Sequence, residues 1–235
     1  MLISLKKLKK TLLSKGKLSQ YLTYALGEIV IVAIGILLAL YLNNWNQNKV
    51  NNKLEKQYYQ SIKDQLTEDL KILKGEIEYN RYFYIQYCYG IELIENNVRT
   101  EIDTLGKISF NMVRFSDFKR KSNIYQTLIN SGEIVILKNK EITKGLESLE
   151  ETYLYINRLE ENHSTIIFSQ IIQDLKEIIQ LKPVKVLRPD LLYNYKVKND
   201  FSILVILMNE INDVYDQGVD RLQKIISLID KELSK

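Results

Sequence analysis

Few side chains in this sequence have the types and spacing that catalysis or metal binding requires. Its one His, His163, and its one Cys, Cys88, are far apart, and a zinc site would need further carboxylate ligands. The sequence contains no GxSxG, P-loop, HExxH or GxGxxG motif. Adjacent acids such as Glu160 and Glu161 point in different directions on a helix, so we expect both, together with His163, to be solvated. We therefore expect no catalytic residue, no cofactor, no metal site and no enzymatic activity.

The aromatic segment YNRYFYIQYCYG, residues 79–90, is a second candidate for function. Two interpretations are open: a core helix contacted on two sides, with Cys88 as a buried inert thiol, or an exposed patch that binds a partner or a flat ligand. Tyrosine suits such a patch because it offers a large contact area at a low cost in side-chain entropy. The exposure of the rings distinguishes the two interpretations. The patch would comprise Tyr79, Tyr82, Phe83, Tyr84, Tyr87 and Tyr89.

The most hydrophobic segment of the chain, residues 21–42, predicts a transmembrane helix. Glu28 is the one charged side chain among these 22 residues. As a helix the segment would span roughly 33 Å, enough for a hydrocarbon core of about 30 Å. Tyr21 and Trp45 lie at its two ends, where interfacial aromatic residues are expected. The alternatives are a soluble core helix and a cleaved signal peptide, but the apolar run is too long for the latter and no small-residue cleavage site follows it.

The net charge of +4 belongs to a short basic leader, residues 1–20, which contains six Lys and no acid. Because only Lys49 lies close on the other flank, we expect the N-terminus in the cytoplasm and residues 43–235 on the extracytoplasmic side. The leader is either an amphipathic helix on anionic lipid, with Leu5, Leu8 and Leu12 on one face, or a disordered basic tail. The remaining chain is nearly neutral, so we expect no nucleic-acid partner.

The polar and small residues of the apolar segment fall on one side of a helical wheel. Glu28, Gly35 and Ala39 lie within roughly 60° of one another at about 100° per residue. One interpretation is a helix–helix seam, with the chain self-associating or meeting the membrane helix of a partner, because small residues allow close approach and a polar group avoids lipid. The alternative is that Glu28 simply lies near the cytoplasmic interface and extends toward water.

Two segments carry a resemblance to a known family. Residues 21–46, YLTYALGEIVIVAIGILLALYLNNWN, and residues 125–153, YQTLINSGEIVILKNKEITKGLESLEETY, resemble the recurring motifs of the bacterial "domain of unknown function 6090" family, common in Bacteroidota. Together they cover about a third of the chain, and Gln47 stands where the family often has Glu. The resemblance implies a single-pass membrane protein and no established activity.

Beyond the membrane segment, apolar residues recur at steps of three and four and predict an all-α body. We expect the membrane helix to continue as a stalk to about residue 97, a long helix from Asn139 to about residue 181, and a last helix over about 200–233. Gly132 suits a helix C-terminus, and the segments 134–137 and 184–187 are the candidate extended pieces. The expected domains are the leader 1–20, the transmembrane helix 21–42 and an extracytoplasmic up-and-down helical bundle, 43–235.

Two function classes remain open for a protein in the bacterial cytoplasmic (inner) membrane. The first is an interaction or scaffold protein whose partners are the lipid bilayer and either a second copy of the chain or another membrane protein. The second is an extracytoplasmic ligand-sensing module. Because a leader of about 20 residues is too small for a signalling domain, a sensor of this kind would need a separate signalling partner. Between these two classes the sequence favours the interaction protein.

Overall fold

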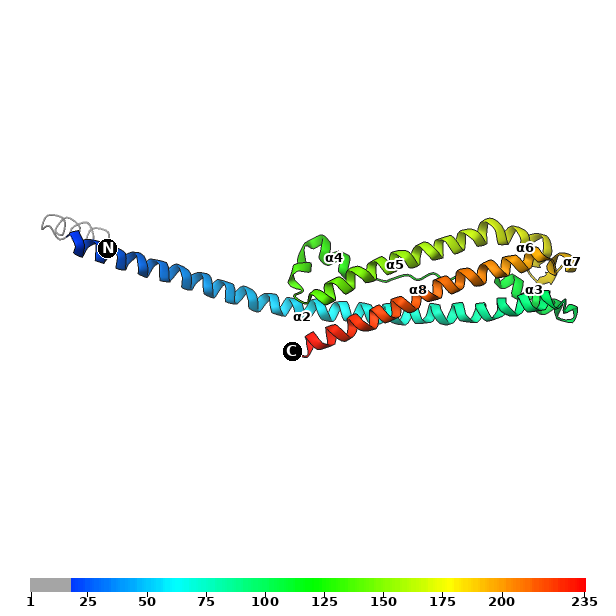
Figure 1. Ribbon diagram of the computed structural model, residues 1–235, viewed down its shortest axis with the longest axis horizontal. Coiled ribbons are helices and arrows are strands. Elements are labelled where there is room, and N and C mark those ends of the chain that lie inside the picture. The colour runs from blue at the N-terminus through cyan, green and yellow to red at the C-terminus, as the bar shows by residue number, and fades with distance from the viewer. Residues whose placement is uncertain (1–17) are drawn as a thin grey trace. The chain divides into compact units, whose positions relative to one another are not determined.

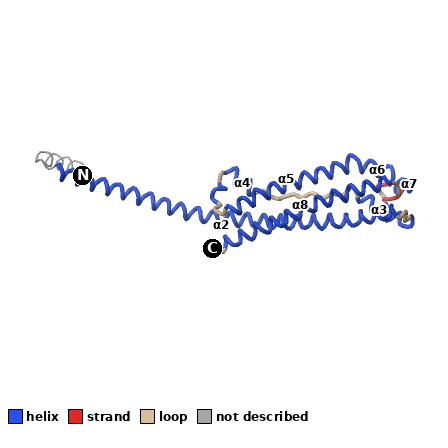
Figure 2. Tube along the Cα trace, in the orientation of Figure 1, coloured by secondary structure: helices blue, strands red, loops and turns tan. Residues whose placement is uncertain are grey.

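The computed structural model describes residues 18–235, with side chains from Leu22 onward. The chain divides into two compact units, one that ends at Leu54 and one that comprises Glu55–Lys235. Helix α2 (Leu18–Glu95) contributes residues to both. Helices dominate the described residues and the two short strands are confined to one hairpin (Figure 2), so the prediction of an all-α fold is confirmed.

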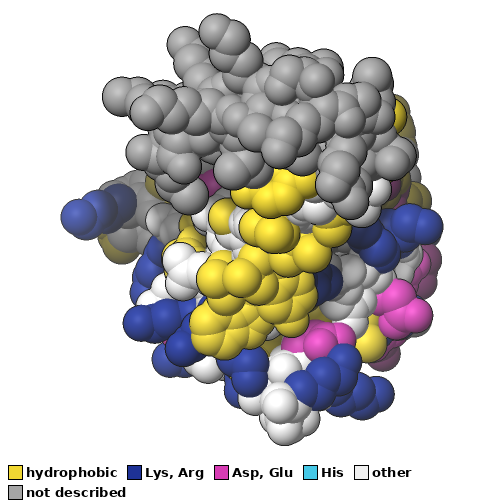
Figure 3. Space-filling model, turned by 90° about the vertical axis from the view of Figure 1, so that its left-hand side faces the viewer, with side chains coloured by type: hydrophobic (Ala, Val, Ile, Leu, Met, Phe, Trp, Pro, Cys, Tyr) yellow, Lys and Arg dark blue, Asp and Glu magenta, His cyan; other side chains and the backbone are white. Residues whose placement is uncertain are grey.

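In the first unit, the apolar part of α2 is exposed among the described residues. Its large hydrophobic side chains from Leu22 to Leu42 are all exposed, for example Ile31 at 71 % and Leu37 at 65 %. Hydrophobic side chains also form a continuous area at the surface in the space-filling view (Figure 3). By length and composition this helix is able to cross a membrane.

The second unit consists of the remainder of α2, two further long helices and several short elements. Residues 134–137 were a candidate extended piece, but Gly132, with φ of 74°, leads directly into a 3-10 turn there. The candidate extended piece at 184–187 is present and pairs antiparallel with residues 179–181.

After α2, the elements of the second unit are η1 (Arg99–Glu101), α3 (Ile102–Asn111), α4 (Ile124–Ser131), η2 (Glu133–Ile136), α5 (Lys140–Ile166), the π-helical turn η3 (Ile167–Ile171), α6 (Ile172–Ile178), β1 (Ile179–Leu181), β2 (Val184–Val186), α7 (Pro189–Leu192) and α8 (Tyr195–Leu233).

The three long helices of this unit lie side by side (Figure 1). Here the expected up-and-down order is wrong, because α2 and α5 run parallel and only α8 runs antiparallel to them. The chain returns between α2 and α5 through residues 112–123, which form no regular element and which we call the crossover segment. Twelve extended residues span about 40 Å, as does a helix of 27 residues such as α5. The crossover segment is therefore long enough to follow the whole helix back.

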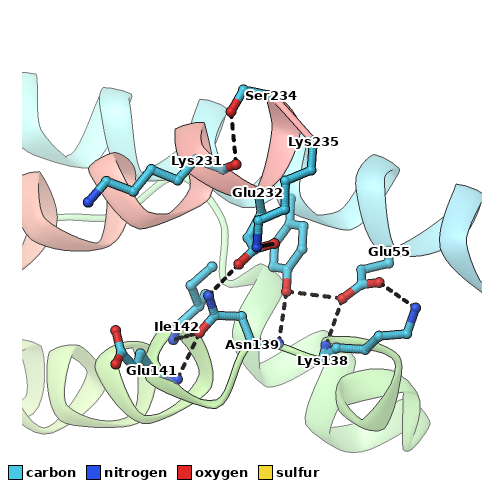
Figure 4. Close-up of polar contacts among 10 residues, drawn as sticks. Glu55, Lys138, Asn139, Glu141, Ile142, Lys231, Glu232, Ser234 and Lys235 are labelled. Atoms are coloured by element: carbon cyan, nitrogen blue, oxygen red, sulfur yellow. Dashed lines mark hydrogen bonds and ion pairs between the residues drawn. The ribbon is translucent and has the colours of Figure 1, made fainter.

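At one end of the bundle, Asn139 joins the three long helices (Figure 4). Its Oδ1 accepts hydrogen bonds from the backbone N–H groups of the first turn of α5, as expected for an N-cap. Its Nδ2 donates to Glu232 of α8 at 2.6 Å, and its backbone N–H donates to Tyr59 of α2 at 3.2 Å. Glu55 accepts a hydrogen bond from the backbone of Lys138 at 2.7 Å. The backbone and side chain of one residue thus link all three helices at this end.

The interior of the bundle contains two apolar clusters. The first lies toward the Asn139 end and includes Leu73, Ile156 and Leu222. The second lies toward the β-hairpin and includes Tyr87, Ile167 and Phe201. Along α2 and α5 the chain passes from one cluster to the other near residues 77–83 and 159–166, and these two stretches contain the buried polar side chains of Asn80, Glu160 and His163.

Candidate functional site

Five buried polar side chains form a layer between the two apolar clusters, which we call the polar layer. Asn80 comes from α2, Ser116 from the crossover segment, Glu160 and His163 from α5, and Tyr215 from α8. Nδ2 of Asn80 donates to Oγ of Ser116 at 3.2 Å. A polar group buried in a helical bundle is costly unless it is hydrogen-bonded. The hydrogen bonds of Asn80, Glu160 and Tyr215 link α2, the crossover segment, α5 and α8.

Glu160 is at the centre of this layer. Its side chain is buried, and its Oε1 accepts a hydrogen bond from the backbone N–H of Phe118 at 2.9 Å and a second from the hydroxyl of Tyr215. The pKa of Glu160 is raised to about 7, chiefly by burial and also by the nearby carboxylates of Asp117 and Glu76, although the two hydrogen bonds oppose this rise. Glu160 thus changes its charge near neutral pH.

His163 lies one turn beyond Glu160 and is fully buried. Neither ring nitrogen has a hydrogen-bond partner among the described residues. Burial lowers the pKa of His163 to about 4, because a charged imidazole would be poorly solvated there. The expectation that Glu160 and His163 are solvated is therefore wrong. The spacing Ile156, Glu160, His163, Ile167 follows the inner stripe of α5 into η3, and this spacing is the signal in the sequence that could have placed both residues in the interior.

A pocket of about 590 Å³ opens beside the polar layer. The crossover segment provides one wall through residues 115–120, and α5 provides the other through Asn157, Glu160, Glu161 and Ser164. Its volume falls within the range of about 300–1,000 Å³ that is typical of small-molecule sites. Sequence reasoning missed this pocket, because the crossover segment has no periodic pattern that reveals which of its residues face α5.

The aromatic segment of α2 combines both expected interpretations. Tyr87 and Phe83 are buried in the second apolar cluster, and Tyr79 and Tyr84 are partly buried. Tyr82 and the intervening Ile85 are each 62 % exposed, and Tyr89 is 41 % exposed. The six rings therefore do not form one patch, and only an outward stripe of the segment is available to a partner. Cys88 in the same segment, expected to be buried, is only partly so.

Glu28, Gly35 and Ala39, the residues of the expected helix–helix seam, lie on the uncovered part of α2. All three are exposed, and a Cβ atom placed on Gly35 would meet no other atom within 4 Å. The described chain thus leaves this stripe accessible to a neighbouring helix. Residues 1–17 of the basic leader, including Leu5, Leu8 and Leu12, lie outside the described residues, and residues 18–20 belong to α2.

Comparisons with known proteins add no assignment to this geometry. No family model, no curated protein and no solved structure matches the chain. Within residues 18–235, no group of three or more His, Cys, Asp or Glu side chains is placed to hold a metal ion. Function must therefore be inferred from the residues of this chain and their arrangement, of which the exposed apolar helix and the pocket beside Glu160 are the two most informative features.

Proposed function

We propose that this chain is a single-pass protein of the bacterial cytoplasmic membrane whose helical domain acts as an interaction or scaffold module rather than as an enzyme. The observation that carries the proposal is the exposure of the apolar part of α2, residues 22–42. In water each exposed apolar side chain costs about 25 cal/mol per Å² of surface, whereas in a bilayer this surface is favourable. The resemblance of residues 21–46 and 125–153 to the domain of unknown function 6090 family supports the same reading.

The proposed orientation follows from the charges that flank the helix. Six Lys precede the apolar segment and only Lys49 follows it closely. Positive residues are retained on the cytoplasmic side during insertion. We place the leader, residues 1–20, in the cytoplasm, the membrane span at residues 21–42 and the helical domain, residues 43–235, on the extracytoplasmic side.

Protease accessibility tests this topology. With an epitope tag before Met1, protease added outside intact spheroplasts should remove the helical domain and leave a membrane-bound, tagged fragment of the leader and span. The lipid bilayer protects the cytoplasmic side, so the tag should be lost only when the spheroplasts are lysed first. Loss of the tag in intact spheroplasts, with the helical domain retained, would reverse the orientation. Release of the intact protein by an alkaline wash would exclude a membrane span altogether.

The exposed stripe of Tyr82, Ile85 and Tyr89 supports an interaction role for the domain. These residues are spaced by three and four positions and therefore share one outward face of α2. Tyrosine is enriched in the cores of protein–protein interfaces. In the proposed function, this stripe is a contact surface for a partner outside the membrane.

The membrane helix provides a second place for association. If Glu28, Gly35 and Ala39 form a seam, Gly35→Leu and Glu28→Leu should each weaken association of the membrane segment by about 1 kcal/mol or more in a bacterial two-hybrid assay. Leu37→Ala is the matched control, because Leu37 lies on a different side of the helix, and it should leave association unchanged. If Gly35→Leu has no effect, or if the segment does not associate, Glu28 merely lies near the interface.

A ligand-sensing module is the second candidate function, and the pocket beside Glu160 is the observation that favours it. The pocket is bounded by a segment without regular structure, residues 115–120, which packs on α5. A ligand there would contact both α5 and the crossover segment. Binding would thereby alter the contact between two parts of the bundle, as a sensor requires, and a separate partner would transmit the signal.

A further inference from the structure

The charges that line the pocket beside Glu160 are not balanced. Both of its cationic residues already have carboxylate partners: Nζ of Lys119 lies 2.6 Å from Asp117, and a guanidinium nitrogen of Arg120 lies 2.5 Å from Glu150. The two remaining acids, Glu160 and Glu161, form no ion pair within residues 18–235. The pocket lining therefore contains three acids and two bases, and its net charge is negative when all three acids are ionised.

Glu160 is also built into the pocket wall rather than carried on a mobile surface side chain. Its residue is only 6 % exposed, yet it lines the pocket. The hydrogen bonds from Phe118 and Tyr215 both end on Oε1, and Oε2 accepts none from the described residues. These two bonds fix the carboxyl group in position and leave one oxygen for an external donor.

We propose that this pocket binds a small organic ammonium ion, with Glu160 as its buried counter-ion and Glu161 as a second carboxylate at the mouth. The inference specifies the ligand class for the sensing function proposed above and rests on that second candidate. An ammonium group carries three N–H donors and no acceptor. Oε2 of Glu160 and the hydroxyl oxygen of Ser164 are acceptors among the lining residues that suit these donors.

The aromatic residue at one edge of the pocket suits the apolar part of such a ligand. Phe115 lines the pocket, is partly buried, and has its ring held edge-on against that of Phe168 at a centroid distance of 6.0 Å. An alkyl chain attached to the ammonium group would bury surface against this ring, and the ring face also attracts a cation. A bound anion would instead lie next to two unpaired carboxylates, which disfavours it.

Binding of an ammonium ion to the ionised carboxylate has a further signature, the release of a proton. Near pH 6 Glu160 is mostly protonated in the free protein, because its pKa is raised to about 7. The ammonium ion favours the charged form, so complex formation should release a proton to the buffer. A purely structural role of Glu160 would give no such coupling.

Isothermal titration calorimetry of the full chain in lipid nanodiscs tests the proposal with n-butylammonium as the probe. Neutral n-butanol and anionic butyrate serve as ligands of matched shape. We expect n-butylammonium to bind with a dissociation constant of about 1 mM or below. At about pH 6, the binding heat should change with the ionisation enthalpy of the buffer, as proton release requires.

The variant Glu160→Gln should weaken n-butylammonium binding by at least about tenfold and abolish the dependence on buffer, because the amide cannot carry the charge. The control Glu78→Gln removes an exposed acid on a different helix, α2. It should change neither the affinity for n-butylammonium nor the dependence of the binding heat on buffer. Far-UV circular dichroism and thermal unfolding confirm that each variant is folded. Should Glu160→Gln not fold, Ser164→Trp provides the test instead, since it fills the pocket at the surface of α5 and should abolish binding.

Three results would overturn the proposal. If n-butylammonium binds Glu160→Gln as tightly as the original chain, the carboxyl group is not the counter-ion. If n-butanol or butyrate binds more tightly than n-butylammonium, the pocket takes a ligand of another class, and the sensing function stands without this assignment. If none of the three binds at concentrations of about 10 mM, both the ammonium site and the sensing function lose their support.

Discussion

Replacing Tyr87 with alanine is expected to destabilise the helical bundle by about 3–5 kcal/mol, in line with other large-to-small aromatic substitutions in cores. The side chain of Tyr87 is 0 % exposed and lies between the rings of Phe83 and Phe201. Its hydroxyl donates a hydrogen bond to the backbone carbonyl of Asn111 at 2.5 Å. Truncation therefore leaves a cavity in the second apolar cluster and removes the donor of a partly buried carbonyl.

Tyr82→Ala is the matched control for this prediction, because it removes the same side chain from the same helix one face away. Tyr82 is 62 % exposed, so its truncation should change the free energy of unfolding by no more than about 0.5 kcal/mol. Guanidinium unfolding followed by far-UV circular dichroism measures both variants. Equal effects of the two substitutions would mean that the aromatic segment packs differently from the arrangement described.

Glu160→Gln is expected to remove a large part of the dependence of stability on pH. The pKa of Glu160 is raised from 4.5 to about 7 in the folded protein. Between these two values the folded state binds more protons than the unfolded state, so the stability contributed by the protonated carboxyl is fully present below about pH 4.5 and is lost as the pH rises through about 7. Over this window the original chain should lose about 2–3 kcal/mol that the Gln variant retains.

The measurement is the free energy of unfolding of both proteins at several pH values from about 4 to 8. Taking the difference between them cancels other titrating groups, including His163, whose lowered pKa acts in the opposite direction. Glu161→Gln is the control, because it makes the same change at the adjacent, exposed residue and should not remove the pH dependence expected from Glu160. A difference between Glu160→Gln and the original chain that does not change with pH would show that the carboxyl is solvated in the folded state.

The sequence by itself determined the elements of this protein with useful accuracy. Helical periodicity located the long helices, because burial of one face imposes a repeat of about 3.6 residues regardless of which partner covers that face. Local chemistry marked several boundaries. Asn139 caps α5 and Gly132, with φ of 74°, ends α4, since both effects depend only on residues within one turn. The long apolar run of α2 was equally evident from composition.

Only the tertiary structure decided the order of the bundle and the position of the pocket. Residues 112–123 lack a repeat, so nothing local indicated that they return between α2 and α5 and make those helices parallel. Glu160 was expected to be solvated because it is one of two adjacent acids, although its spacing from Ile156 and Ile167 placed it on the inner stripe. Its burial depends on Phe118 and Tyr215, 42 and 55 residues away. The physical reason is that backbone hydrogen bonding and helix caps are local, whereas the burial and pKa of a side chain are determined by whichever distant segments the fold places against it.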